Sequence, residues 1–228
     1  MIKHHPKFEL IQLFVKGDLP ASLSAGIAMH AEMCPKCQEK IAQLTEHVAE
    51  NSFEDESINF KVDNTKNTLE VNESLNFEDM INTITASDKI DTLKPQVEKT
   101  VVFKNKSYTL PAALHNIESG KTANIGKLSR ARLQLNEGEI HTTLLHIEPG
   151  GGVPEHTHKG FELTLLLDGS FHDDEGEYVK GDFIMRDSSH QHQPISKNGC
   201  LCYTVSNAPL HFTQGINKLL NPIGAFIY

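Results

Sequence analysis

The chain has 228 residues, enough for one large domain or two small ones. A formal net charge of −9 argues against a broad basic face for nucleic acid and favours a basic protein partner or a small-molecule site. No apolar run is long enough to span a bilayer, the N-terminus lacks the apolar core of a signal peptide, and the cysteines lie in close pairs, so we expect a cytoplasmic protein whose cysteines bind metal.

Three short helices are predicted within about the first fifty residues. Residues 7–16 place their apolar side chains on one side of a helix, and Gly17 is a stop signal. A second helix opens at Pro20 or Ser22, and Pro35 suits the first turn of a third. A bundle this small buries too little surface to be stable alone, so we expect a bound metal to supply folding free energy.

One imidazole and two thiols stand at H-x3-C-x2-C spacing where the second helix meets the third: His30, Cys34 and Cys37. Thiolates with imidazole favour tetrahedral Zn²⁺, and a C-x2-C turn lets both sulfurs reach one ion. The fourth ligand is expected from the N-terminal pair His4 and His5, which chemistry alone does not separate. The alternative is a cysteine pair that only packs in a helical core. We predict a zinc site near the start of the chain.

An acidic stretch follows these helices. Residues 51–100 hold eleven Asp and Glu against five Lys and Arg, and from about 51 to 74 the periodicity fades as in a solvated linker. Ser74 or Asn76 can cap a further helix, and Pro95 closes the region. This fourth amphipathic helix is predicted from apolar residues at i, i+3, i+4 and i+7, namely Phe77, Met80, Ile81 and Ile84. An isolated helix of this kind must pack on the first three or on a partner.

The chain from about residue 97 onward is predicted to be all-β. Its strand candidates are short, at residues 101–103, 133–135, 141–147, 161–167, 183–185 and 201–205 and around Tyr178. Turns are expected at residues 136–138, 149–152, 168–169 and 180–182. The pair Asp173 and Asp174 is expected in a solvated turn. Regular short strands indicate a sandwich or small barrel.

A second group of metal donors lies in this β region. His156, His158 and Glu162 share parity, so on a regular strand they line one face. Two imidazoles and a carboxylate are a ligand set for Zn, Mn, Fe, Ni or Cu, and a neighbouring strand offers His190 and His192 for the fourth position. The alternative is a group of surface histidines without an ion. Four donors at this spacing favour a second metal site.

The β region resembles the cupins. Their first motif, G(x)5HxH(x)3E(x)6G, is matched at every position, by Gly150, His156, His158, Glu162 and Gly169. Their second motif, G(x)5PxG(x)2H(x)3N, is half met: Gly181 and His192 are in register, but Asp187, Ser189 and Ser196 stand where cupins have Pro, Gly and Asn. The resemblance implies a cupin fold, and its register selects His192 as the fourth ligand, with His190 as the alternate.

The N-terminal half resembles the zinc anti-sigma domain. Joined through an acidic linker to a cupin, it is similar to the ChrR-type anti-sigma factors of bacteria, and the resemblance extends to the run Cys200-Leu201-Cys202. It implies that His5 is the first zinc ligand. The implied fold is two-domain, a small all-α zinc-binding helical bundle followed by an all-β cupin barrel or jelly roll. We expect the first domain at residues 1–90, the second at 91–228, and linker segments at about 51–74 and 88–98.

The same resemblance implies a function. The N-terminal domain would sequester an ECF-type (group IV) sigma factor without binding DNA or membrane directly, which suits an acidic chain with an exposed apolar helix. The cupin would release sigma on an oxidative signal such as singlet oxygen or peroxide. The trigger is either the cupin metal, Zn²⁺ or another divalent transition metal, or oxidation of zinc-bound Cys34 or Cys37 with loss of the ion.

Two alternatives remain open at this point. Cys200 and Cys202 share a strand face and are interpreted as small buried apolar residues, whereas a redox pair near the cupin metal is the other interpretation. The rival function is a metal-dependent cupin enzyme such as a dioxygenase with three His and one Glu on Fe²⁺, because catalytic and non-catalytic cupins share this ligand set. An N-terminal zinc domain, which an enzyme would not need, favours a regulator without catalytic residues, and it equally disfavours a storage or sugar-binding cupin.

Overall fold

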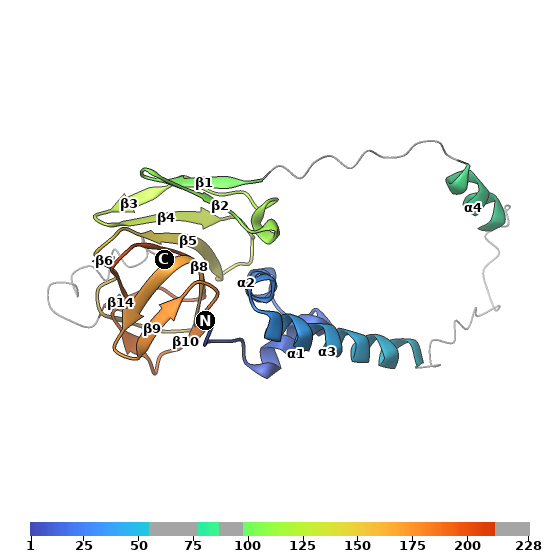
Figure 1. Cartoon of the computed structure of the whole chain (residues 1–228), viewed down its shortest axis with the longest axis horizontal. Helices are drawn as coiled ribbons and strands as arrows, with labels where there is room; N and C mark the ends of the chain where they lie inside the picture. Colours follow the sequence, from blue (N-terminus) through green and yellow to red (C-terminus); the bar gives the residue numbers. More distant parts are fainter. Residues whose placement is uncertain (55–76, 87–97, 213–228) are drawn as a thin grey trace. The chain divides into compact units, whose positions relative to one another are not determined.

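The computed structural model describes residues 1–54, 77–86 and 98–212 (Figure 1). The chain divides into two compact units. One unit consists of Met1–Ser52 together with Glu98–Tyr228, so the N-terminal helices and the β region belong to the same unit. The other consists of Phe53–Val97.

In the described part of the chain, the α-helices occupy the predicted positions: α1 (Phe8–Lys16), α2 (Ala21–Met33), α3 (Pro35–Glu54) and α4 (Phe77–Thr85). α1 ends at Gly17, whose φ of +77° is a left-handed conformation that glycine adopts easily, and whose N–H bonds to carbonyls of the last turn. α3 runs to Glu54, past the expected start of the linker. No described helix is both long and apolar enough to cross a membrane.

α4 is the described helix of the second unit. Ile81 and Ile84, one turn apart, are 57% and 70% exposed, so an apolar surface on this helix faces solvent. The predicted caps Ser74 and Asn76, as well as Pro95, lie outside the described residues.

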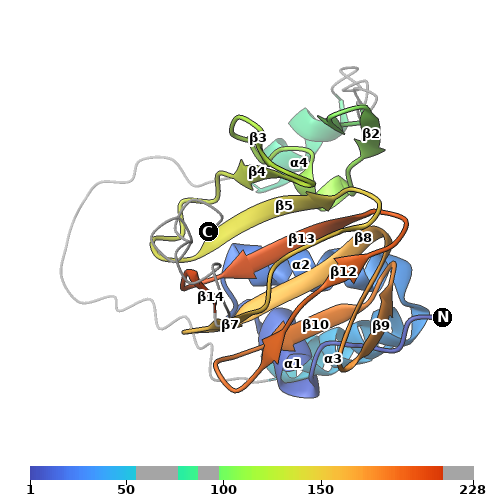
Figure 2. The ribbon, with the colours of Figure 1, turned by 90° about the vertical axis from the view of Figure 1, so that its left-hand side faces the viewer.

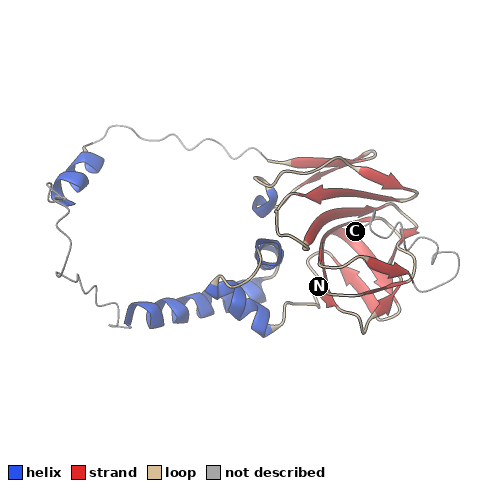
Figure 3. Cartoon of the chain, turned by 180° about the vertical axis from the view of Figure 1, so that it is seen from behind, coloured by secondary structure: helices blue, strands red, loops and turns tan. Residues whose placement is uncertain are grey.

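The β region forms a curled antiparallel sheet, which confirms the predicted fold class (Figure 3). A short 3₁₀ helix, η1 (Ala112–Leu114), follows the first hairpin. The strands before the cupin motifs are β1 (Thr100–Phe103), β2 (Lys106–Thr109), β3 (Ala123–Ile125), β4 (Leu128–Leu133) and β5 (His141–Ile147). The later strands are β6 (Gly151–Gly152), β7 (His156–His158), β8 (Glu162–Asp173), β9 (Gly176–Val179), β10 (Phe183–Arg186), β11 (Gln191–His192), β12 (Ile195–Ser196), β13 (Cys200–Ser206) and β14 (Leu210–Phe212).

β8 pairs with more strands than any other described strand of the largest sheet. The strand order is β3-β4-β5-β13-β8-β12-β6, and β9 and β10 also pair with β8. β7 lies between β11 and β14 in a smaller sheet, and β1 pairs with β2. This arrangement brings both cupin motifs around β7 and β8.

α2 covers one face of β8 and β13 (Figure 2). On this covered face Leu163, Leu165 and Tyr203 pack with Leu23 and Ile27 of α2. The opposite face contributes to a second core of alternate residues, which contains Leu166, Phe171, Ile184, Cys200 and Cys202. The helices are therefore part of the hydrophobic core of the β domain.

Two of the strand and turn predictions are wrong, and a third, the turn at 149–152, holds only for its first half, because Gly151 and Gly152 form strand β6. The strand expected at 133–135 is β4, which ends at Leu133; its buried positions include Ser129 and Ala131, which carry little hydrophobic signal. The turn expected at 168–169 lies inside β8. Gly169 has a φ of +76° next to a shift of register between β13 and β8, so the glycine serves an irregularity in a continuing strand.

Candidate metal centres

The four residues predicted to bind zinc come together between three segments. His5 precedes α1, His30 lies in the last turn of α2, Cys34 follows α2, and Cys37 lies in the first turn of α3. One ligand atom from each residue lies within 4.8 Å of the others. The extended backbone of Cys34 ends α2, and the start of α3 at Pro35 brings both sulfurs to the same side of the junction.

The distances between these donors fit a tetrahedral ion. His5 Nδ1 is 3.4 Å from His30 Nε2, 3.4 Å from Cys34 Sγ and 3.5 Å from Cys37 Sγ. His30 Nε2 is 3.3 Å from Cys37 Sγ. A tetrahedron with Zn–N and Zn–S bonds of about 2.0–2.3 Å has edges of about 3.3–3.8 Å. The residues therefore fit Zn²⁺ in size and in donor type.

Burial prepares this cluster for a cation. His30 and Cys37 are almost completely buried. Desolvation lowers the pKa of His30 and of His5, which keeps both imidazoles neutral and able to donate a lone pair. Desolvation, with Cys34 beside it, raises the pKa of the Cys37 thiol to about 11. A cation bound between the sulfurs would stabilise the thiolate that this environment otherwise disfavours.

His4 points away from the zinc cluster. Its ring contacts the ring of Tyr178 on β9, with centroids 4.8 Å apart. The backbone of the same residue bonds to the β domain, donating to Asp182 and accepting from Phe183. The structure therefore places His5, and not His4, among the donors.

The second predicted cluster also comes together, from three strands. His156 and His158 lie on β7, Glu162 begins β8, and His192 lies on β11 directly opposite His156. The Nε2 atom of His192 is 3.0 Å from that of His156 and 3.2 Å from that of His158. Glu162 Oε2 lies 3.3 Å from His158 Nε2 and 4.0 Å from His192 Nε2. Four donors at this spacing can bind one ion.

The expectation that His156, His158 and Glu162 line one face of a single strand is wrong. β7 ends at His158, and Glu162 starts the next strand after a connection through Gly160. A Cβ atom at Gly160 would lie 2.0 Å from Asn207 Oδ1, which accepts the Phe161 N–H at 2.8 Å, so a larger residue would have to displace this hydrogen-bonded side chain. The carboxylate joins the histidines because two strands converge.

Contacts behind the ligands orient their rings. His156 Nδ1 donates to the Pro154 carbonyl at 2.8 Å, and His192 Nδ1 lies 3.3 Å from Asp173 Oδ2. In both residues this contact leaves Nε2 free to bind a metal. His158 Nδ1 is buried and has no hydrogen-bond partner within the described residues.

The cupin cluster is electrostatically suited to a divalent cation. Desolvation, reinforced by neighbouring His192, lowers the pKa of both His156 and His158 to about 3, so these rings are neutral at physiological pH. Desolvation raises the pKa of Glu162 to about 7. A bound cation would favour ionised Glu162, because its charge would replace the lost hydration of the carboxylate.

His190, the alternate fourth ligand, is outside the cluster. Its Nδ1 atom lies 2.9 Å from Asp187 Oδ1, which also accepts from the Ser189 backbone N–H. Asp187 and Ser189 stand where cupins have Pro and Gly. In this chain the turn is stabilised by hydrogen bonds to the Asp187 side chain, whereas Pro and Gly shape a turn through their backbone conformations.

Sequence reasoning missed Asp173 and Arg186. Asp173 was expected in a solvated turn, but its side chain is completely buried and accepts from Arg186 Nη2 at 2.7 Å while contacting His192. Arg186 also bonds to the Tyr178 hydroxyl at 2.7 Å. Asp174 is exposed, as expected. The sequence spacing carries no signal for this ion pair, because β9 and its turns bring the two residues together.

A small cavity of about 40 Å³ adjoins the cupin cluster. His156, Glu162, His192 and Cys202 contribute to its wall, and the remaining lining is mostly apolar. Cys200 and Cys202 are both buried in the core, with their sulfurs 4.0 Å apart. Both cysteines pack as buried apolar residues, and one of them also faces the cupin cavity.

Comparison with known proteins extends over both halves of the chain. Residues 113–210 match the family model of the ChrR cupin-like domain. The anti-sigma-E factor ChrR of Cereibacter sphaeroides is 27% identical over 228 residues, covering 97% of either chain. A chain in the crystal structure of Rhodobacter sphaeroides SigE in complex with the anti-sigma ChrR shares the fold, with a TM-score of 0.63, 23% identity, and coverage of 90% of this chain and 100% of that chain. The resemblance predicted from the motifs is thus confirmed: the chain is similar over nearly its whole length to the ChrR-type anti-sigma factors.

Proposed function

We propose that this protein is an anti-sigma factor, which sequesters an ECF-type sigma factor and releases it on an oxidative signal received by the cupin domain. The observation that carries the proposal is the similarity to an anti-sigma-E factor over 97% of both chains, which includes the helical and the cupin halves. The four-donor cluster of His5, His30, Cys34 and Cys37 supports zinc as the ion of the helical half.

The first test is capture of a partner. The full chain is co-expressed with each ECF-type sigma factor of the source cell in turn, and the complexes are purified and analysed for metal. We expect one sigma factor in a 1:1 complex that contains zinc, and Cys34→Ser should abolish it because the helical junction loses a ligand. Cys200→Ser is the matched control, since it removes a thiol far along the chain. Absence of any sigma partner for the zinc-loaded protein would refute the proposal.

α4 is proposed as part of the sigma-binding surface. The predicted stripe contains Phe77, Met80, Ile81 and Ile84, and the two isoleucines are exposed. Burying an isoleucine side chain contributes about 1.5–3 kcal/mol, so loss of both would weaken binding by well over 100-fold.

The matching experiment replaces Ile81 and Ile84 by Asp and measures the affinity for sigma. Asn82→Asp together with Thr83→Asp is the control, because it adds the same charge to the same helix outside the apolar stripe. Equal affinities for the two double variants would show that the stripe is not part of the interface.

The cavity beside the cupin cluster supports a small signal molecule. Its volume of about 40 Å³ has room for a molecule about the size of water. Pockets for organic substrates are typically about 300–1,000 Å³. Within the described residues the site therefore fits a small reactive oxygen species better than the substrate of a cupin dioxygenase.

Two routes of sigma release make opposite predictions. If the cupin site is the trigger, His156→Ala abolishes release while Cys34 and Cys37 stay reduced in the wild-type protein. If oxidation of the zinc thiolates is the trigger, His156→Ala still releases sigma, and mass spectrometry detects oxidised Cys34 or Cys37 with loss of zinc. A cavity adjoins each cluster, and the one at the zinc cluster has His5 and Cys37 in its wall. We propose the cupin route, because Cys34 and Cys37 are almost completely buried, which limits their oxidation.

A further inference from the structure

We propose that the turn at Gly181 and Asp182, between β9 and β10 of the cupin domain, positions two ligands of the zinc cluster. The inference deepens the proposed function and rests on zinc binding by the helical half. If this is so, the zinc affinity of the N-terminal site depends on a turn of the β domain that contains none of the four zinc-binding residues.

The first link is to His30. Its Nδ1–H donates to the Gly181 carbonyl at 2.7 Å, and the ring is completely buried. This bond selects the tautomer whose Nε2 lone pair faces His5 and Cys37. Gly181 adopts a φ of +92°, and a Cβ there would lie 2.5 Å from Ile2, so glycine is required to present the carbonyl in this way.

The second link is to the segment that carries His5. Asp182 is completely buried, and its Oδ1 accepts the backbone N–H groups of Lys3 at 2.7 Å and His4 at 3.0 Å. Its Oδ2 accepts from Val179 N–H at 2.8 Å, which fixes the carboxylate in the turn. The Phe183 N–H then donates to the His4 carbonyl at 3.0 Å. The residue directly before ligand His5 is thus hydrogen-bonded on both sides.

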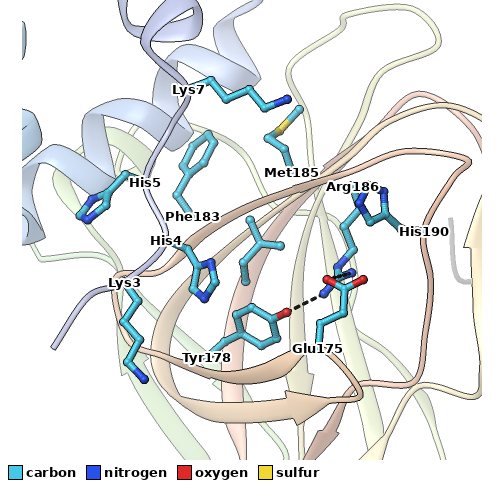
Figure 4. Close-up of a pocket in the computed structure, with 11 residues that line it drawn as sticks. Lys3, His4, His5, Lys7, Glu175, Tyr178, Phe183, Met185, Arg186 and His190 are labelled. Carbon is cyan, nitrogen blue, oxygen red and sulfur yellow. Dashed lines mark hydrogen bonds and ion pairs between the residues drawn. The ribbon is translucent and has the colours of Figure 1, made fainter.

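The N-terminal segment borders an open space on one side. A cavity of about 310 Å³ lies between this segment and β9 and β10, with Lys3, His4 and Lys7 on one side and Tyr178 and Phe183 on the other (Figure 4). The hydrogen bonds of Asp182 and Phe183, together with the packing of Ile2 beside the zinc cluster, hold the segment on the barrel.

The two strands on either side of this turn, β9 and β10, also support the cupin cluster. Arg186, three residues after Phe183, bonds to Asp173 and to Tyr178, and Asp173 contacts ligand His192. Tyr178 in turn lies under the ring of His4. The contacts behind the ligands of the two clusters thus meet on β9 and β10, which gives a continuous path between the sites.

The test measures zinc affinity of the full chain by competition with a chromophoric chelator. Asp182→Asn removes the charge and one acceptor oxygen, and we expect zinc affinity to fall about 10- to 100-fold, the usual effect of losing a partner behind a metal ligand. Asp174→Asn, an exposed change in the neighbouring turn between β8 and β9, is the control and should leave the affinity unchanged. An affinity within twofold of wild type for Asp182→Asn would overturn the proposal.

A second pair of variants leaves the barrel intact. Lys3→Pro removes one N–H that donates to Asp182, whereas Lys3→Ala keeps it. We expect only the proline variant to lose zinc affinity, and equal affinities would overturn the proposal even if Asp182→Asn did not fold.

A double-mutant cycle separates positioning from general destabilisation. If Asp182 acts by placing His5, then Asp182→Asn has little further effect on zinc affinity in a His5→Ala background. Full additivity of the two changes would show that Asp182 acts through overall stability, which would also overturn the proposal.

Discussion

Gly26 tests whether α2 packs on the barrel as the structure describes. It lies in the middle of α2, facing β8, and a Cβ at this position would be 2.7 Å from Leu163 Cδ2, 3.6 Å from Tyr203 and 3.7 Å from Phe183. Favourable carbon–carbon contacts lie at about 3.5–4.0 Å, so the closest one is about 1 Å too short. Leu163 is completely buried in the core that α2 shares with β8 and β13, which restricts its movement.

Gly26→Val should therefore destabilise the protein. Overpacking a buried site costs about 1–3 kcal/mol, and the helix propensity gained over glycine recovers only a few tenths. We expect a net loss of about 1–2.5 kcal/mol, or about 2–10 °C in melting temperature for a chain of this size. On a helix with that face open to solvent, the same change would be neutral or slightly stabilising.

The assay is urea unfolding of the zinc-loaded chain, with Ala28→Val on the same helix as the control for the β-branched side chain. Combining Gly26→Val with Leu163→Ala should recover at least about 1 kcal/mol relative to the sum of the single changes, because the methyl groups enter the vacated space. Two results would refute packing of α2 on β8. One is a loss of unfolding free energy for Gly26→Val no larger than that for Ala28→Val. The other is full additivity of the losses for Gly26→Val and Leu163→Ala.

Three further predictions concern the same unit. Tyr203→Phe removes the bond from the buried phenol to the Ser22 carbonyl at 2.8 Å, and should cost about 1–2 kcal/mol in urea unfolding; no change would contradict this contact. Removing zinc with a chelator should lower the melting temperature of the helices and of the β domain together, in one calorimetric transition, because the two share a core. A β-domain transition whose melting temperature does not change would contradict this prediction. The affinity of the cupin cluster for Mn²⁺ should rise with pH up to about 7, because Glu162 (pKa about 7) must lose its proton while His156 (pKa about 3) is already neutral. Titration by isothermal calorimetry would check this, and Glu162→Gln should remove that part of the slope.

Local patterns predicted most of the secondary structure. The apolar period of 3.6 residues, Gly17 and Pro35 predicted the helices, because helix formation and its ends depend on neighbouring residues. Short alternating runs predicted most of the longer strands. β4 was mispredicted because small buried residues hide the alternation of apolar and polar side chains along the strand. The turn at Gly169 was mispredicted because a glycine in a strand irregularity looks the same in the local sequence as a glycine in a turn.

The sequence by itself determined the types of potential metal donor and their spacing. Thiols and imidazoles at fixed short intervals restrict the possible metal chemistry before any fold is known, and the cupin register favoured His192 over His190. In the structure, the donor atoms of each predicted set lie within 4.8 Å of one another.

Only the tertiary structure decided how the two halves meet. The choice of His5 follows from the hydrogen bonds that direct the neighbouring His4 toward Tyr178. The burial of Asp173 against Arg186 and the anchoring of the N-terminus on Asp182 join residues far apart in the chain. Such contacts arise from strand pairing and packing over long sequence separations, and neither periodicity nor motif spacing in a single sequence records them.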